Sequence, residues 1–252
     1  MNLDLALQRA PAPLRQVLRV VRGDCRGVPL RRLTEVSVLR QLLDDYAPRY
    51  PDAKPAAIAS QWSMDYLCLI MPAVVGAALE LGAEIDATQA AAELLLDQAM
   101  PSAIFVDASC RPLSPSEHSA LFSHLFTEHL EPFVAALAMA GKVSPKLLWT
   151  NVVVVWDGLF TRLEGSLRPA SAAHGWLKTR TVQAGQRALR PLQQWEPSPA
   201  ADLPQEIPVR KQCCLHYRLH KDGPPVWCES CPKLRRQPLE EQLRYLRSVY
   251  TS

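Results

Sequence analysis

The sequence predicts a mainly α-helical fold, or an α+β fold with a short β-hairpin or small sheet, that ends in a cysteine-rich module. Apolar residues recur at helical spacing through most of residues 1–195. Proline is abundant at 22 residues and glycine is scarce at 10, which is typical of helices with proline-marked ends rather than of a glycine-rich nucleotide-binding protein. The cysteines cluster near the C-terminus, where we expect a metal-stabilised unit.

The first helices are identified by their apolar spacing and their proline signals. Residues 35–47 should form an amphipathic helix. Its apolar face consists of Leu39, Leu42, Leu43 and Tyr46. Pro55 opens a second helix, which should break or kink at Pro72 because proline removes a backbone donor and clashes with the preceding turn. Gly82 should end this helical stretch.

The later helices begin at serine–proline signals. Ser114-Pro115-Ser116-Glu117 is a capping box with proline at the first helical position, and Pro132 should bend or restart the helix that follows. Ser144-Pro145 starts another helix. Residues 172–194 and 238–250 are also expected to be helical. The last helix should turn inward Leu239, Leu243, Leu246 and Tyr250.

Two segments have no single interpretation from local pattern. Residues 86–107 begin with helical propensity, yet two apolar triplets flank a polar turn as in a hairpin, so both structures stay open. Residues 196–209 are rich in proline and are predicted to be a linker or an extended strap. We therefore divide the chain into a helical body over 1–195, a linker over 196–209, and a module with a C-terminal helix over 210–252.

Composition excludes several classes of protein. With 48% hydrophobic residues the chain is not intrinsically disordered, and a net charge of +3 is too small to indicate nucleic-acid binding. No secretory signal is visible, and the longest uncharged apolar stretch, 66–79, is shorter than the ~20 residues of a spanning helix. We expect a soluble, cytoplasmic protein, at most loosely associated with the inner membrane, whose cysteines are thiols or metal ligands.

Four of the seven cysteines form a pattern of metal-ligand type. They are Cys213, Cys214, Cys228 and Cys231. Two pairs of thiolates a loop apart fit one tetrahedral zinc ion or an iron–sulfur cluster, and spacing alone leaves both open, with a vicinal disulfide as a third reading. The remaining cysteines, Cys25, Cys68 and Cys110, are expected to be small buried hydrophobes.

The cysteine segment carries a resemblance to a known family. The stretch Arg210-Lys211-Gln212-Cys213-Cys214-Leu215-His216-Tyr217-Arg218-Leu219, followed by Cys228-Glu229-Ser230-Cys231, resembles the C-terminal signature of the FhuF-type ferric-siderophore reductases. Ser60-Gln61-Trp62 and Leu148-Trp149-Thr150-Asn151 are similar to weaker helical motifs of that family. The loop between the cysteine pairs is longer than is typical of the family, and Thr150 stands where the family often has glycine.

This resemblance implies a 2Fe–2S cluster ligated by the four clustered cysteines, in a C-terminal iron–sulfur module packed on the helical body. It also implies one-electron reduction of siderophore-bound Fe(III), of hydroxamate type, with release of Fe(II) in the cytoplasm. No glycine-rich phosphate loop is visible, so electrons should come from a separate donor such as ferredoxin, flavodoxin or its reductase. No catalytic residue separate from the cluster is indicated. The alternatives are a zinc-stapled binding or scaffold protein and a plain iron–sulfur electron-transfer protein.

The charged and aromatic residues near the cysteines have two interpretations. Residues 210–236 carry seven basic and two acidic residues, which either compensate an anionic thiolate cluster or steer an acidic electron carrier. The steering residues would be Lys221, Lys233, Arg235 and Arg236. His216 and His220 are not needed as ligands beside four cysteines. Trp227 is a candidate shield for the cluster. Core tryptophans are expected at Trp62, Trp149, Trp156 and Trp176, and ordinary helix histidines at His118, His124 and His129.

Overall fold

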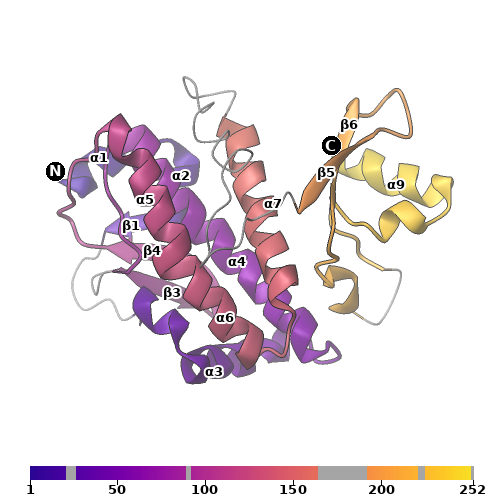
Figure 1. The fold of residues 1–252 in the computed structure, drawn as a ribbon, viewed down its shortest axis with the longest axis horizontal. Coiled ribbons are helices and arrows are strands. Elements are labelled where there is room, and N and C mark those ends of the chain that lie inside the picture. Colours follow the sequence, from indigo (N-terminus) through magenta and orange to yellow (C-terminus); the bar gives the residue numbers. More distant parts are fainter. Residues whose placement is uncertain (21–26, 89–91, 164–191, 221–224, 251–252) are drawn as a thin grey trace.

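The computed structural model describes residues 1–20, 27–88, 92–163, 192–220 and 225–250 (Figure 1). Its helices are α1 (Leu3–Gln8), α2 (Ala12–Val17), α3 (Val36–Tyr46), α4 (Pro55–Gly76), α5 (His118–His124), α6 (Glu131–Ala140), α7 (Pro145–Leu163) and α9 (Leu239–Tyr250). Its strands are β1 (Leu18–Val20), β2 (Val28–Pro29), β3 (Glu93–Asp97), β4 (Met100–Val106), β5 (Gln193–Pro197) and β6 (Glu206–Arg210). The prediction of a mainly helical fold with small sheets is confirmed.

A small mixed sheet completes the helical body. Its strand order is β1-β4-β3-β2, with β1 parallel to β4 and the other pairs antiparallel. Residues 86–107 therefore contain a hairpin rather than a helix. Gln98 and Ala99 have φ angles of 47° and 65°, the left-handed values that a tight two-residue hairpin turn requires. The apolar triplets flanking this turn lie on the two strands of the hairpin, with Leu94 paired to Ile104, and β4 is largely buried between its neighbours.

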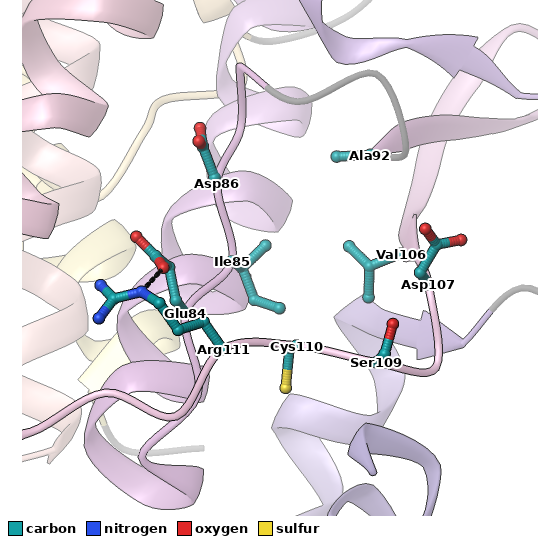
Figure 2. Close-up of a pocket in the computed structure, with 9 residues that line it drawn as sticks. All are labelled: Glu84, Ile85, Asp86, Ala92, Val106, Asp107, Ser109, Cys110 and Arg111. Atoms are coloured by element: carbon teal, nitrogen blue, oxygen red, sulfur yellow. Dashed lines mark hydrogen bonds and ion pairs between the residues drawn. The ribbon is translucent and has the colours of Figure 1, made fainter. Parts of the chain in front are cut away.

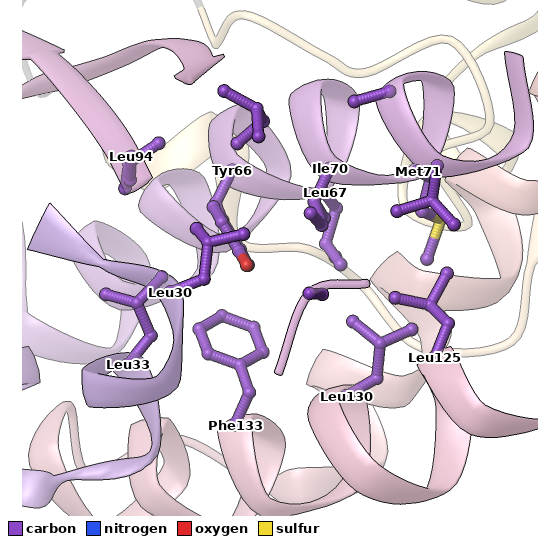
Figure 3. Packing of buried hydrophobic residues seen from close by; sticks show 14 of the residues in the cluster. Leu30, Leu33, Tyr66, Leu67, Ile70, Met71, Leu94, Leu125, Leu130 and Phe133 are labelled. Carbon is purple, nitrogen blue, oxygen red and sulfur yellow. The ribbon is translucent and has the colours of Figure 1, made fainter. Parts of the chain in front are cut away.

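Helix α4 is the central helix of the body and packs against β4, α2, α3 and α7. The predicted break at Pro72 is wrong, because α4 runs unbroken through it. The residues around Pro72, including Ile70, Met71 and Val74, are fully buried, so tertiary packing offsets the local cost of the proline (Figure 3). A π-turn over Ala77–Leu81 follows and ends at Gly82, whose φ of 58° confirms the predicted stop.

By length and composition, Pro55–Leu81 is apolar enough to cross a membrane, and it is the one such helix in the part of the chain described. In its most apolar window, 56% of the stretch is buried inside the protein. A core helix of this kind passes the same test as a membrane span.

The other helices predicted for residues 35–163 are present. The four apolar residues predicted on α3 are buried. The capping box at Ser114 opens a short 3₁₀ turn over Pro115–Glu117 that leads into α5. Pro132 lies in the first turn of α6, after a π-turn over Leu125–Leu130, so it restarts the helix as expected. Helix α7 begins at Pro145.

The C-terminal region has a second, smaller apolar core, formed by Leu203, Ile207, Trp227, Cys231, Leu234 and Leu246. Residues 196–209, predicted to be a linker or an extended strap, include parts of β5 and β6, which pair as antiparallel strands, and the loop between these strands contributes Leu203 to this core. Of the helix predicted over 172–194, residues 172–191 lie outside the described residues, and Gln193 begins β5. Helix α9 is present, but Leu239 is 55% exposed instead of inward.

The two cores lie on opposite sides of α7. In Figure 1 the sheet of β1 to β4 lies on the N-terminal side, and β5, β6 and α9 lie together beyond α7. The C-terminal module, which we define as residues 193–250 on the basis of this core, contains all four clustered cysteines.

One buried histidine gives the body a pH-dependent stability. The Nε2 atom of His129 lies 2.5 Å from the Tyr66 hydroxyl oxygen, and burial lowers the pKa of His129 to about 4. In the unfolded chain this pKa is about 6.5. The unfolded state therefore binds the proton first as pH falls, and the free energy of unfolding should decrease from about pH 6.5 toward pH 4, by about 2 kcal/mol at pH 5.

We expect the variant His129→Gln to lose this part of the acid sensitivity, because glutamine can keep a hydrogen bond to Tyr66 but does not titrate. The measurement is urea unfolding of both proteins at pH 7.5 and pH 5. Equal losses of stability on acidification would contradict the assignment of His129 as a buried neutral group.

Candidate metal centre

The four clustered cysteines come together from two segments of the module. Cys213 and Cys214 follow β6, and Cys228 and Cys231 lie in the turn that precedes the 3₁₀ segment Leu234–Arg236. The Sγ atoms of Cys214 and Cys228 are 3.3 Å apart, and the Cys231 thiol group contacts those of Cys213 and Cys228. Cys213 and Cys214 are both free thiols, so the adjacent pair forms no disulfide.

Main-chain geometry explains how two adjacent cysteines reach one site. The Leu215 N–H donates to Cys213 Sγ at 3.4 Å, and the φ of 65° at Leu215 turns the chain directly after the cysteine pair. On the other side, the Cys231 N–H donates to the Cys228 carbonyl at 3.0 Å and closes the Cys-x2-Cys turn. The end of β6 is tied to this turn, because the Arg210 N–H donates to the Ser230 carbonyl at 3.0 Å.

The environment of the sulfurs favours thiolates at two of the four positions. A hydrogen bond from the Cys228 thiol, together with the charge of Arg210 and the His216 N–H, lowers the pKa of Cys214. Bonds from the Cys213 and Cys228 thiols, and from the Leu234 and Lys233 N–H groups, lower the pKa of Cys231. The pKa values of Cys213 and Cys228 are raised by their contacts with the neighbouring sulfurs and by burial. Metal binding at this site would release the shared protons.

This donor set fits a thiolate-ligated metal group. Four soft sulfur donors, backbone N–H groups directed at sulfur, and an apolar surround of Trp227, Leu234 and Leu246 are the features that stabilise such groups in proteins. Within the described ranges, no group of three or more His, Cys, Asp or Glu side chains has the arrangement of a preformed single-ion site.

The helical body fastens the first cysteine pair through a buried polar network. The Ser60 hydroxyl on α4 donates to the Cys214 carbonyl at 2.6 Å. Asn151 on α7 donates through Nδ2 to the Ser60 and Ser63 hydroxyl oxygens, at 3.2 and 2.8 Å. Its Oδ1 accepts from an Arg210 terminal nitrogen at 2.9 Å. The sequence motifs around Ser60 and Asn151, which sequence reasoning noted without assigning a role, therefore meet at the cysteine site.

The histidines near the cysteines face the body. His216 Nδ1 lies 2.9 Å from Gln61 Oε1, and Gln61 Nε2 donates to Asp65 at 2.9 Å. Asp65 also accepts from the buried Tyr46 hydroxyl at 2.5 Å, and burial raises the pKa of its carboxyl group. The His220 ring packs edge-on against Tyr50 with centroids 5.5 Å apart. These contacts make the two histidines docking residues between module and body.

Trp227 is buried, and it packs in the module core with Cys231. Its ring stacks on Tyr217 at 5.7 Å, its indole N–H donates to Glu241 at 3.2 Å, and its carbonyl accepts from Tyr245 at 2.5 Å. These contacts fix the indole ring in the module core, in the same cluster as Cys231. Trp62 and Trp156 are fully buried as predicted, Trp149 is half-buried, and Trp176 lies outside the described residues.

The predicted basic surface is smaller than the sequence indicates. Arg235 has a side chain only 14% exposed that pairs with Glu196 at 3.7 Å. Arg210 is 2% exposed. Lys221 lies outside the described residues, and Lys233 is half-buried with its ammonium 5.1 Å from the Tyr217 ring centroid. Of the proposed steering residues, Arg236 is the one the structure describes as exposed.

The scattered cysteines differ from expectation. Cys68 is exposed rather than buried, because it lies on the open side of α4. Cys110 is half-buried, and Cys25 lies outside the described residues.

A separate pocket of about 240 Å³ lies at the N-terminal side of the body, away from the clustered cysteines (Figure 2). Glu84, Asp86, Asp107 and Arg111 contribute its charged groups, and Arg111 is directed to Glu84. The Cys110 N–H donates to the Met1 carbonyl, which places this pocket beside the chain start. No residue of the C-terminal module lines it.

Comparison with known proteins gives one match. The model of a family described as "Ferric iron reductase FhuF-like transporter" matches residues 60–223, which is more than half of the chain. The matched region begins at Ser60 on α4, contains Asn151 on α7, and includes Cys213 and Cys214. It ends before Cys228 and Cys231. No curated protein matches the chain.

Proposed function

The chain belongs to the family of FhuF-like ferric iron reductases, and from that premise we propose that it reduces siderophore-bound Fe(III) to Fe(II) through a 2Fe–2S cluster. The residues that would hold the cluster are Cys213, Cys214, Cys228 and Cys231. The observation that supports this proposal is the meeting of the four sulfurs, drawn from two segments, with backbone N–H groups directed at them. Such a cluster supplies a one-electron reductant whose potential depends on hydrogen bonds and solvent exposure.

The chemistry of the substrate explains why such a donor is needed. Hydroxamate oxygens are hard ligands that bind Fe(III) far better than Fe(II). Each tenfold preference for Fe(III) lowers the potential of the bound iron by about 59 mV for one electron. Reduction therefore requires a strong reductant or rapid removal of Fe(II), and the weaker binding of Fe(II) then lets the siderophore release it.

The exposure of the four cysteines indicates the side from which the siderophore and the electron carrier would approach. Cys214 and Cys231 are buried, at 5% and 3% exposure, whereas Cys213 and Cys228 are half-buried. A bulky ferric siderophore and a separate electron-carrier protein would thus approach the side of Cys213 and Cys228. Ser60 and Asn151 hold the Cys214 side against the body, and Trp227 would limit water access from the module core, where it packs with Cys231.

The test uses protein purified or reconstituted without oxygen. It measures the iron and sulfide bound per chain and the number of electrons that the protein accepts. We expect brown protein with about two irons and two sulfides per chain, and a one-electron EPR signal on reduction. Ferric hydroxamate siderophore should reoxidise the reduced protein, with Fe(II) appearing on a ferrous chelator. The chelator should drive the reaction further, because removing Fe(II) raises the effective iron potential.

Two outcomes would replace the proposal by its alternatives. Colourless protein that keeps one zinc after reconstitution with iron and sulfide would indicate a zinc-stapled module. A reduced cluster that never passes its electron to a ferric siderophore would indicate a plain electron-transfer protein.

A further inference from the structure

Arg210 is a buried cation whose hydrogen-bond partners are neutral. It is 2% exposed at the end of β6. Its guanidinium donates to the Asn151 amide oxygen at 2.9 Å and to the Ser230 hydroxyl at 3.1 Å. Among the residues described, no carboxylate forms an ion pair with it. A buried charge without an opposite charge is strongly unfavourable, so the fold must supply an anion nearby.

The cysteine site is the source of negative charge to which Arg210 is connected by hydrogen bonds. Arg210 precedes Cys213 by three positions, and both its main chain and its side chain bond to Ser230, the neighbour of Cys231. Asn151, which holds the guanidinium, also holds Ser60, whose hydroxyl donates to the Cys214 carbonyl at 2.6 Å. The guanidinium is thus connected to the neighbour of Cys231 through Ser230, and to Cys214 through Asn151 and Ser60.

We propose that Arg210 is the built-in countercharge of the cysteine site and that it raises the reduction potential of the cluster. This inference rests on the proposed function. A cluster with four thiolate ligands is anionic and gains one further negative charge on reduction, so a fixed positive charge stabilises the reduced state more than the oxidised state. Because the site is largely buried, solvent and salt screen this effect little. Asn151 and Ser230 are positioning residues that keep the charge in place.

The functional consequence is easier loading of the electron. A cluster potent enough to reduce a ferric siderophore risks being too difficult for its donor protein to reduce. A buried countercharge moves the potential upward, toward that of the donor, without adding an exposed charge that would also attract other partners.

The experiment is a spectroelectrochemical titration of the reconstituted protein and three variants. Arg210→Gln removes the charge and keeps a polar side chain, and Arg210→Lys keeps the charge. Lys211→Gln removes the same charge from the exposed neighbouring residue and is the matched control. At a fixed potential we expect the ratio of reduced to oxidised cluster to fall about tenfold in Arg210→Gln, which is about 59 mV. The ratio should change less than about twofold in Arg210→Lys and Lys211→Gln, since a charge exposed to water is screened.

An unchanged potential in Arg210→Gln, or an equal shift in Lys211→Gln, would overturn the proposal. If Arg210→Gln is too unstable to load, Asn151→Asp places a carboxylate against the guanidinium and should also lower the potential, and no shift there would also overturn the proposal.

If the site takes zinc alone, the proposed function fails but the countercharge is still tested. Zinc affinity should then fall about tenfold in Arg210→Gln and recover in Arg210→Lys, and equal affinities would reject the countercharge.

Discussion

Replacing Cys214 or Cys228 by serine should remove the visible absorption of the reconstituted protein. A serine hydroxyl is harder than a thiol and poorly ionised near neutral pH, so it makes a weak ligand for iron in a sulfur site. Cys214 and Cys228 come from different segments, and their sulfurs are 3.3 Å apart. Losing either one therefore removes one of the contacts that join the first cysteine pair to the second.

The loss should also loosen the module, because metal binding and local folding are coupled. We expect iron and sulfide contents near zero in both variants, together with faster amide exchange over 213–231, measured by mass spectrometry. The matched control is Cys68→Ser, in which the same chemical change is made at an exposed cysteine on α4. A Cys68→Ser protein that loses the cluster while Cys214→Ser keeps it would show that the ligand assignment is wrong.

The parts of the fold predicted from sequence are those with strong local signals. The helix at 36–46 was recognisable because its apolar residues share one face, and the helix at Pro145 because Ser-Pro is a typical start. Pro72 shows the limit of such signals. The proline rule describes a helix in water, whereas α4 is held on most sides by other elements.

The sequence predicted that the four clustered cysteines act together, but it did not predict the architecture of the C-terminal module. The cysteine spacing indicated a metal site, and the structure brings those four side chains together. The prolines of 196–209 suggested a linker because local composition cannot show that Ile207 would pair across a hairpin and join a small core. Likewise Arg210 counted as one of seven basic residues, since charge in a sequence does not tell whether a side chain is buried.

The role of Asn151 could not be predicted from the sequence for the same reason. The residue lies in a helical motif 62 positions before Cys213, and only packing shows that it bonds to α4 and to the end of β6 at once. Sequence could have indicated the position, because a polar side chain within the apolar run of α7 needs hydrogen-bond partners.

The variant Asn151→Ala should weaken the attachment of the module to the body. It leaves the Ser63 and Ser60 hydroxyl oxygens without their donor and removes the acceptor of a buried guanidinium. Leaving buried polar groups unpaired costs about 1–3 kcal/mol each, and more for charged groups, so we expect a loss of about 3 kcal/mol in the free energy of unfolding. Urea unfolding measures this loss, and amide exchange near Cys214 should rise with it.

The control is Gln194→Ala, on the exposed face of β5, which should change the free energy of unfolding by less than about 0.5 kcal/mol. The four cysteines are intact in both variants, so each should still bind the metal. An Asn151→Ala protein as stable as Gln194→Ala would mean that the polar network does not fasten the module, and that the apolar contacts around α7 hold it instead.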